Sequence, residues 1–350
     1  SNIVPWQMAC QQSGAILRVI PMNDDGELRL DVLESLLNDK TKLVAVNHVS
    51  NSLGSINDVK RIAHMAHAVG AKVLVYGEKW VAHHVTDVRD IHCDFYAFSG
   101  HKLFGRKGIG VLYGKRALLE ALPPYQGGGD MIESVTFEKT IYAQLPNKFE
   151  AGTPHVEGGI GLGAAIDWVQ SVGLEKIAAY EHELLEYATQ RLTSEVKGLR
   201  IIGTAKNKAD VISFVLDDPW FHPYDVGVAL DMDGIAIRTG HHCCQPVMVR
   251  MCVSATARAS SACYNTREDV DALVGALTRL VSGHLPGPVA SSAKLTSPGN
   301  RIDVDAERIL PQARFRARRL HHDGQDRRPV LGRQRRSISI RVFDPCDTKR

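Results

Sequence analysis

Long hydrophobic segments are absent from this sequence of 350 residues. No apolar run approaches the roughly 18 residues that a membrane-spanning helix needs, and no secretory signal opens the chain. The seven cysteines include no CxxC pair and follow no regular spacing, which is more typical of reduced thiols than of a disulfide scaffold. We therefore predict a cytoplasmic protein without membrane contact.

The sequence also has little net charge, but that charge is unevenly placed. Lys and Arg number 42 and Asp and Glu 39. Residues 311–350 hold 12 basic and 4 acidic residues, a net +8, whereas the rest of the chain holds 30 and 35, a net −5. No aromatic interleaving or RNA-binding motif accompanies these arginines. We expect a basic, disordered tail over 285–350 rather than a nucleic-acid-binding segment, which is the alternative.

Hydrophobic periodicity predicts a sheet covered by helices in the first part of the chain. Short apolar runs, beginning with 15–22, alternate there with helical patterns and polar loops as far as Tyr113. This order is typical of a mainly parallel sheet. Three of the expected strands end at Asn47, Tyr76 and Ser99, so we expect the loops that follow them to lie along one edge of the sheet.

Longer helices and short strands follow residue 158 and predict a second domain of the α+β class. We place a large α/β domain, incomplete at its start, over 1–170 and the small α+β domain over 171–284. Proline, glycine and serine then mark a linker, and apolar periodicity ends there.

One polar turn follows a strand at the expected sheet edge. The run Asp94–Gly110 reads as a buried strand, then Ser-Gly-His-Lys, then glycines and a second apolar strand. Lys102 would lie at the carboxyl end of its strand, where open α/β sheets bind ligands. Ser99 and His101 can donate hydrogen bonds to an anion. A solvated loop lysine is the alternative that this turn alone would favour.

A second polar segment, Arg-Thr-Gly-His-His-Cys-Cys-Gln-Pro, spans residues 238–246. Zinc fits it poorly, because four consecutive side chains cannot all converge on one ion and no second ligand pair lies at finger-like spacing. A reactive thiol at Cys243 fits better, since two histidines precede it, Arg238 is near, and positive neighbours favour the thiolate. A structural cysteine is the alternative.

Arg258 lies among small and apolar residues of an expected strand. An unpaired charge in such a place is costly, so the guanidinium needs an anionic partner. A substrate carboxylate bound bidentately and an internal Asp or Glu are the two candidates, and the sequence leaves both open.

Taken in order, four motifs resemble those of the Suf-type (group II) cysteine desulfurases, which are pyridoxal-phosphate enzymes of the class V aminotransferase family. The motifs are Ser-Gly-His-Lys-Leu, Phe-Glu-Ala-Gly-Thr-Pro, Arg-Thr-Gly-His-His-Cys and Arg-Ala-Ser-x-Ala-x-Tyr-Asn-Thr. The resemblance extends from about Asn2 to about Val281. It implies the type I fold of pyridoxal-phosphate enzymes and a homodimer. It also implies removal of sulfur from L-cysteine, or from L-selenocysteine, for iron–sulfur cluster assembly, with a sulfur-acceptor protein as partner.

The resemblance assigns roles to individual positions. Lys102 would form the Schiff base with the cofactor and move the proton from the substrate α-carbon. Cys243 would attack the substrate sulfur and carry it as a persulfide, leaving alanine. Ser99 and His101 would hold the cofactor phosphate, and Thr153 would reach it from the neighbouring subunit.

The same resemblance places the substrate carboxylate on Asn51 and Arg258, with Arg238 beside them. It also exposes departures, since residues 75–80 read Val-Tyr-Gly-Glu-Lys-Trp where the family has Val-Asp-Gly-Ala-Gln-Ala. Tyr76 replaces the aspartate that pairs with the pyridine nitrogen, and Lys79 replaces the glutamine that donates to the phenolic oxygen of the cofactor.

The family's segment with further phosphate ligands and a ring-stacking histidine lies upstream of Ser1, so we expect a chain truncated at its N-terminus. These departures predict weakened catalysis. The alternative function is therefore an impaired or inactive desulfurase remnant that acts as a non-catalytic dimerisation or interaction protein.

Overall fold

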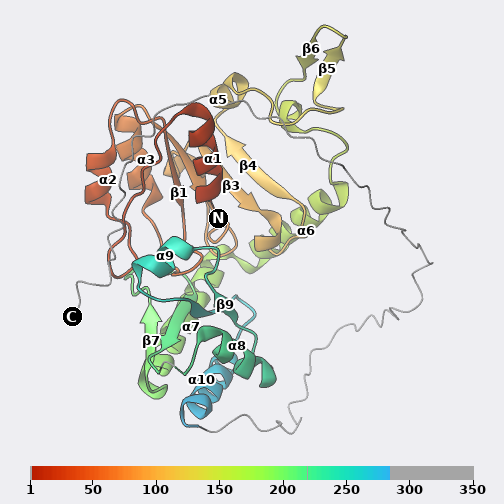
Figure 1. Ribbon diagram of the computed structural model, residues 1–350. Helices are drawn as coiled ribbons and strands as arrows, with labels where there is room; N and C mark the ends of the chain where they lie inside the picture. Colours follow the sequence, from red (N-terminus) through yellow and green to blue (C-terminus); the bar gives the residue numbers. More distant parts are fainter. Residues whose placement is uncertain (1, 219, 284–350) are drawn as a thin grey trace, which may run out of the picture. The chain divides into compact units, whose positions relative to one another are not determined.

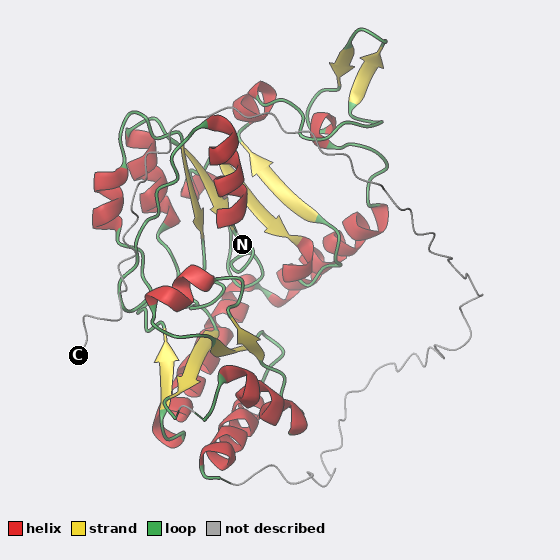
Figure 2. Cartoon of the chain, in the orientation of Figure 1, coloured by secondary structure: helices red, strands yellow, loops and turns green. Residues whose placement is uncertain are grey.

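The computed structural model describes residues 2–218 and 220–283, and the expected tail over 285–350 lies outside them. This part of the chain forms two four-stranded sheets, each with its own apolar core, and one separate hairpin (Figures 1 and 2). None of its helices combines the length and the apolar character needed to cross a membrane.

The first sheet has the strand order β1-β2-β3-β4. β1, β2 and β3 are parallel, and β4 is antiparallel to β3, which confirms the predicted mainly parallel α/β arrangement. Valines alternate inward along β1 and β2, as expected for strands covered by helices. The elements of this part are α1 (Ile3–Ser13), α2 (Leu30–Leu36), β1 (Leu43–Asn47), α3 (Val59–Ala68), β2 (Lys72–Tyr76), α4 (Val88–Ile91), β3 (Phe95–Ser99), the short 3-10 helix η1 (Gly100–Lys102), β4 (Gly110–Gly114) and α5 (Arg116–Ala121).

The strand expected over residues 15–22 does not form. Ile16 and Val19 are 81% and 61% exposed, and Met22 makes only an isolated bridge with Leu28. An apolar run can become a strand only if a neighbouring strand satisfies its backbone groups. No strand of the described residues lies beside this run, and it therefore remains extended coil.

The second sheet has the order β7-β8-β10-β9, and all its neighbouring pairs are antiparallel. Its central strand β8 is almost wholly buried, and α10 begins after a capping box formed by Thr266 and Asp269. The elements here are α6 (Val156–Val172), α7 (Leu174–Glu195), β7 (Leu199–Ile202), β8 (Val211–Leu216), α8 (Pro223–Met232), β9 (Arg238–Gly240), α9 (Gln245–Arg250), β10 (Thr256–Ser260) and α10 (Arg267–Val281).

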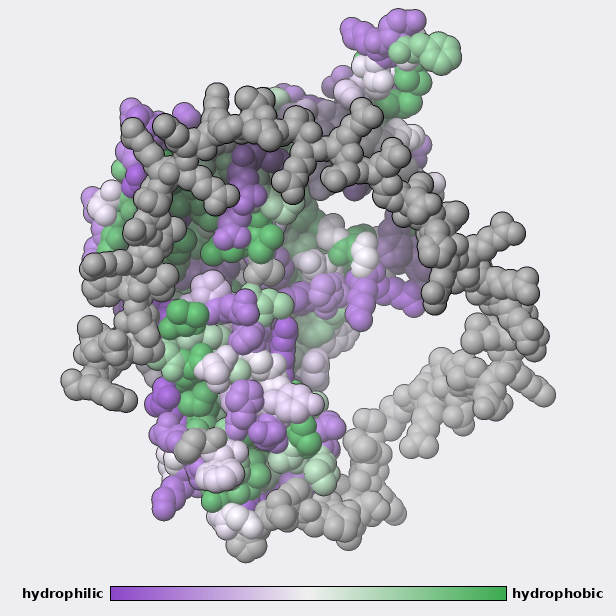
Figure 3. Space-filling model, viewed as in Figure 1, coloured by the Kyte–Doolittle hydropathy of each residue, from purple (hydrophilic) through white to green (hydrophobic). Residues whose placement is uncertain are grey.

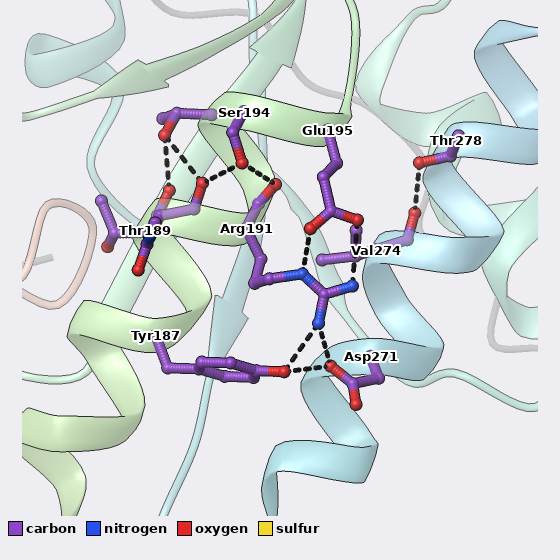
Figure 4. A network of polar contacts seen from close by, with 10 residues as sticks. Tyr187, Thr189, Arg191, Ser194, Glu195, Asp271, Val274 and Thr278 are labelled. Carbon is purple, nitrogen blue, oxygen red and sulfur yellow. Dashed lines mark hydrogen bonds and ion pairs between the residues drawn. The ribbon is translucent and has the colours of Figure 1, made fainter.

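Helix α7 contributes to both apolar cores, with Ile177 in the first and Leu184 in the second. The cores therefore meet within this helix, and the predicted domain boundary between residues 170 and 171 stays a prediction. Polar contacts join α7 to α10 (Figure 4): Arg191 donates to Asp271 and, at 2.6 Å, to the Tyr187 hydroxyl. Because these groups are partly exposed, their main effect is to fix the pairing of the two helices.

The segment between α5 and α6 carries a hairpin that stands apart from the two sheets, with η2 (Asn147–Phe149) after it. Its strands are β5 (Ile132–Val135) and β6 (Thr140–Tyr142). Phe137 at the turn is fully exposed. Figure 3 shows hydrophobic and hydrophilic residues side by side on this hairpin. Such an exposed apolar surface is typical of an interface.

Asp210, which is half-buried just before β8, carries a carboxylate that destabilises the folded protein. One oxygen of its carboxylate has no hydrogen-bond partner in the described part of the chain. Burial, and to a smaller extent the charge of Glu181, raises the pKa of Asp210 to about 6. The folded protein therefore disfavours the carboxylate, whose destabilising effect is complete above pH 6 and disappears as the pH falls toward 4.

We expect Asp210→Asn to raise the free energy of unfolding at pH 7.5 by on the order of 2 kcal/mol and to change it little at pH 4. Denaturant titrations at the two pH values measure this. The exposed Asp39→Asn is the control, and an equal gain at both pH values would contradict the assignment to ionisation.

Candidate active site

Lys102 ends the short helix η1 directly after β3, at the carboxyl edge of the first sheet. The turn is tied to the start of β4, because the Gly100 amide donates to the Ile109 carbonyl at 2.9 Å. A Cβ at Gly100 would lie 2.8 Å from the Ile109 side chain, so only glycine allows this close approach. Lys102 and Ser99 are half-buried, and His101 is exposed.

Tyr76 ends the neighbouring strand β2 and lies at the same sheet edge as Asn47, its partner on β1. Its hydroxyl accepts a hydrogen bond of 2.9 Å from the indole nitrogen of Trp6 on α1. Burial raises the pKa of Tyr76 above its usual value, so the phenol is neutral near pH 7. No motif in the sequence indicated this role of Trp6, because 70 residues separate the two side chains.

Lys79 lies among other cations. Its pKa is lowered to about 8, first by burial and then by the charges of Arg258, Lys102 and Arg238, while Glu181 acts in the opposite direction. Lys79, Lys102, Arg238 and Arg258 come from separate segments of the sequence, and they form one cluster of basic side chains. Such a cluster attracts anions such as phosphate and carboxylate.

Arg258 is 8% exposed in β10, and it donates to the Asn51 carbonyl at 2.7 Å. The Asn51 amide in turn donates to the His242 carbonyl at 2.6 Å. Within residues 2–218 and 220–283, Arg258 forms no ion pair with Asp or Glu, and its buried Nε atom has no hydrogen-bond partner. The internal-carboxylate alternative therefore fails for this part of the chain. The guanidinium therefore needs an anion from outside the described residues.

Cys243 lies beside Arg238, whose Nη2 atom is 3.5 Å from the sulfur. Arg238 and Arg258 face one another across β9 and β10. His242 contributes no positive charge, because burial and the two arginines lower its pKa to about 4. The positive charge next to the Cys243 sulfur thus comes from Arg238 rather than from His242.

The backbone around Cys243 adopts an uncommon conformation. His242 and Cys243 have φ angles of 52° and 59°, in the left-handed region that residues other than glycine rarely occupy. Cys243 itself is exposed, whereas His242 is buried and hydrogen-bonded to Thr256 at 2.8 Å. The turn therefore exposes the Cys243 thiol to solvent, while the buried His242 side chain anchors the backbone before it.

The phosphate-binding residues expected from the sequence are not all brought together. Ser99 and His101 flank the turn of Lys102, but Thr153 is exposed in the loop between η2 and α6. In the described part of the chain the side chains of these three residues make no hydrogen bond. Among residues 2–218 and 220–283, no hydrogen bond or ion pair links Thr153 to Lys102.

Trp80 forms a stack that sequence reasoning did not foresee. Its ring lies between those of His48 and His84, with centroid distances of 3.8 and 4.1 Å. Burial lowers the pKa of His48 to about 3 and that of His84 to about 4. Stacking on these two neutral rings stabilises the loop after β2, which also carries Lys79.

Comparison with known proteins identifies the family of this chain. The profile of the aminotransferase class-V family matches residues 1–273. A cysteine desulfurase of Synechococcus elongatus is 52% identical over 285 residues, which are 81% of this chain but 45% of that protein. A cysteine desulfurase of Salmonella choleraesuis is 52% identical over 281 residues, 80% of this chain and 68% of that protein.

The fold is similar to that of a solved structure of the same kind. The crystal structure of the cysteine desulfurase CsdA from Escherichia coli has a TM-score of 0.76 at 38% identity, covering 80% of this chain and 69% of that one. The predicted type I fold of pyridoxal-phosphate enzymes is thereby confirmed. This chain spans less than half the length of the Synechococcus relative.

Proposed function

Because this chain belongs to the aminotransferase class-V family, whose members use pyridoxal phosphate, we propose that it is a cysteine desulfurase of the Suf type. One observation carries the proposal. Cys243 lies 3.5 Å from Arg238, and Arg238 acts on the same Lys79 as Lys102 and Arg258. A thiol, an amine and a carboxylate-binding arginine therefore belong to one cationic site, which suits an amino acid that gives up sulfur.

The residues of the site fit most of the cofactor. Pyridoxal phosphate has an aldehyde, a phosphate and a pyridine ring, and it supplies an electron sink when bound. The amine of Lys102 suits the aldehyde. Ser99 and His101 suit the phosphate, which the surrounding cations would also attract. For the ring, this chain would offer the neutral phenol of Tyr76 where the family has a carboxylate.

Substrate binding falls to Arg258 and Asn51. The unpartnered Nε–H of Arg258 would donate to the carboxylate of L-cysteine, while Nη1 continues to donate to the Asn51 carbonyl. Lys102 Nζ, when uncharged, would take the proton from the substrate α-carbon. The exposed thiol of Cys243 is then the group that meets the substrate sulfur.

The sulfur transfer conserves atoms and electrons without a further reagent. The Cys243 thiolate forms a bond to the substrate sulfur, and the bond between that sulfur and the β-carbon breaks. The β-carbon keeps the electron pair of the broken bond and gains the proton of the substrate thiol. L-cysteine and the Cys243 thiolate thus give alanine and a Cys243 persulfide, in which the transferred sulfur has been oxidised and the carbon reduced.

The wider setting follows from the same proposal. We infer a homodimer, supported by the exposed apolar side chains of the hairpin and by Ile160 and Trp168 on α6. The neighbouring subunit's copy of the Thr153 loop would complete the phosphate site. A sulfur-acceptor protein of iron–sulfur cluster assembly would unload Cys243, in the cytoplasm. L-selenocysteine is a possible second substrate, because selenium repeats the same chemistry.

A second candidate function is a desulfurase remnant that serves as a non-catalytic dimerisation or interaction protein. The observation that favours it is the neutral Tyr76 phenol, already bound to Trp6, at the edge of the site. A neutral phenol stabilises a cationic ring less than a carboxylate does. This candidate predicts purification with a desulfurase or scaffold partner and no release of alanine.

Alanine release from L-cysteine distinguishes the two candidates. We expect the protein with added pyridoxal phosphate to release alanine, and Lys102→Ala to abolish the release. Lys176→Ala, on the exposed surface of α7, should retain it. No alanine above the Lys102→Ala background would reject the desulfurase proposal in favour of the second candidate.

Arg258→Ala should raise the KM for L-cysteine by about 10- to 100-fold, because a hydrogen-bonded charge contributes roughly 1.5–3 kcal/mol. Arg258→Lys should recover only part of the loss, since lysine cannot bind a carboxylate bidentately. Steady-state kinetics of alanine release measure both variants. An unchanged KM in Arg258→Ala would place the substrate carboxylate elsewhere.

A further inference from the structure

The contact between Trp6 and Tyr76 joins the first helix to the edge of the first sheet. Trp6 lies on α1, which Figure 1 shows beside the strands of that sheet. Its indole nitrogen is 2.9 Å from the Tyr76 hydroxyl, and both side chains are partly buried. The backbone of Tyr76 is fixed as well, because its carbonyl accepts from the His48 amide at 2.9 Å and the Gly77 amide donates to Ala97 at 2.8 Å.

The direction of this hydrogen bond is determined by chemistry. An indole N–H can only donate, so the phenolic oxygen accepts and keeps its own proton for a second hydrogen bond. Within residues 2–218 and 220–283, no acceptor receives that proton. Tyr76 therefore has one donor left over, on a side chain whose position is fixed by Trp6.

The charge of the surroundings decides what this donor can bind. Burial raises the pKa of Tyr76 and Glu78 raises it further, while the bond from Trp6 acts in the opposite direction. The hydroxyl is thus a neutral donor near pH 7. The cations Lys79, Lys102 and Arg258 belong to the same site and disfavour a further positive charge. A neutral acceptor atom suits this position, and a protonated ring nitrogen does not.

We propose that Trp6 is a positioning residue that directs the Tyr76 hydroxyl to donate to an unprotonated ring nitrogen of a planar heteroaromatic ligand. This inference rests on the proposed function, in which that ligand is the pyridine ring of the cofactor. It adds that the site binds the ring in its neutral form, through one neutral hydrogen bond. Trp6 acts only through Tyr76.

Titration of the phenol tests the first half of the proposal. The Tyr76 phenolate is followed by ultraviolet absorbance in protein without added ligand, with Tyr76→Phe as the reference that lacks the signal. We expect Trp6→Phe to raise the pKa of Tyr76, because a donor to the phenolate is lost while the ring is kept. Trp220→Phe, at an 87% exposed position, should leave it unchanged. An unshifted titration in Trp6→Phe would overturn the proposal.

Binding of pyridoxine 5'-phosphate tests the second half. This probe has the ring and phosphate but no aldehyde, so its affinity does not depend on bond formation at Lys102. We expect Tyr76→Phe to weaken binding by about two- to tenfold, the range of a neutral hydrogen bond, and Trp6→Phe to weaken it less. In the double variant Trp6→Phe should add nothing further, since it acts through the missing hydroxyl. Thermal unfolding checks that each variant is folded.

The outcomes separate this proposal from the proposed function. Normal binding of the probe to Tyr76→Phe or to Trp6→Phe, or fully additive losses in the double variant, would overturn the role of Trp6 and leave the desulfurase proposal intact. Failure of the unaltered protein to bind the probe at all would overturn both. A loss in each single variant without additivity supports the positioning role.

Discussion

Replacing Cys243 by serine is expected to lower the rate of alanine release by on the order of a hundredfold or more, because a hydroxyl is a far weaker nucleophile than a thiolate. The thiol is exposed, and the guanidinium of Arg238 lies 3.5 Å from its sulfur. Binding of L-cysteine should be retained, because Arg258 and Asn51 are unchanged. A substrate-dependent change in the absorbance of bound pyridoxal phosphate measures that binding.

Cys244→Ser is the matched control for this prediction. Cys244 is the next residue along the chain and is half-buried at the start of α9. Its replacement should leave alanine release within about twofold of the original rate, since surface-type substitutions away from reacting groups have small effects. An equal loss in both variants would point to damage of the shared turn rather than to the chemistry of Cys243.

The second large effect is expected from Tyr76→Asp, as a gain. A carboxylate at the end of β2 would stabilise a protonated ring nitrogen and would also offset the repulsion among the cations around Lys79. The difference between a charged and a neutral hydrogen bond is about 1–2 kcal/mol, so we expect alanine release to rise about tenfold.

Tyr76→Asn separates charge from size in this experiment. Asparagine has the shape of aspartate without its charge, so it should show no comparable gain. A rise in both variants would mean that the bulk of the phenol, rather than its neutrality, limits the reaction. No rise in Tyr76→Asp would mean that Tyr76 does not limit it at all.

The turn that carries Lys102 could be predicted from the sequence because its signal is local. A buried apolar run followed by Ser-Gly-His-Lys and glycines fixes the strand, the turn and the edge of the sheet within a few residues. Alternation of strands and helices likewise predicted the parallel order of β1, β2 and β3. The strand that local periodicity predicted at residues 15–22 does not form, because a strand also needs a neighbouring strand to bond its backbone groups.

Contacts between side chains far apart in the sequence could not be predicted from local patterns. The bond from Trp6 to Tyr76 spans 70 residues, and the low pKa of Lys79 depends on burial and on charges from three other segments. The sequence also suggested that histidines would help to activate Cys243. That expectation failed for His242, because burial and the charges of Arg258 and Arg238 lower the pKa of its ring to about 4.

The most direct test of the account is the mass of the peptide that contains Cys243 after a single turnover. The protein is mixed with pyridoxal phosphate and less than one equivalent of L-cysteine, quenched with an alkylating reagent and digested. We predict one additional sulfur atom on Cys243, none on Cys244, and alanine in equal amount. Alanine without sulfur on Cys243, or sulfur on Cys243 that persists in Lys102→Ala, would contradict the proposed transfer.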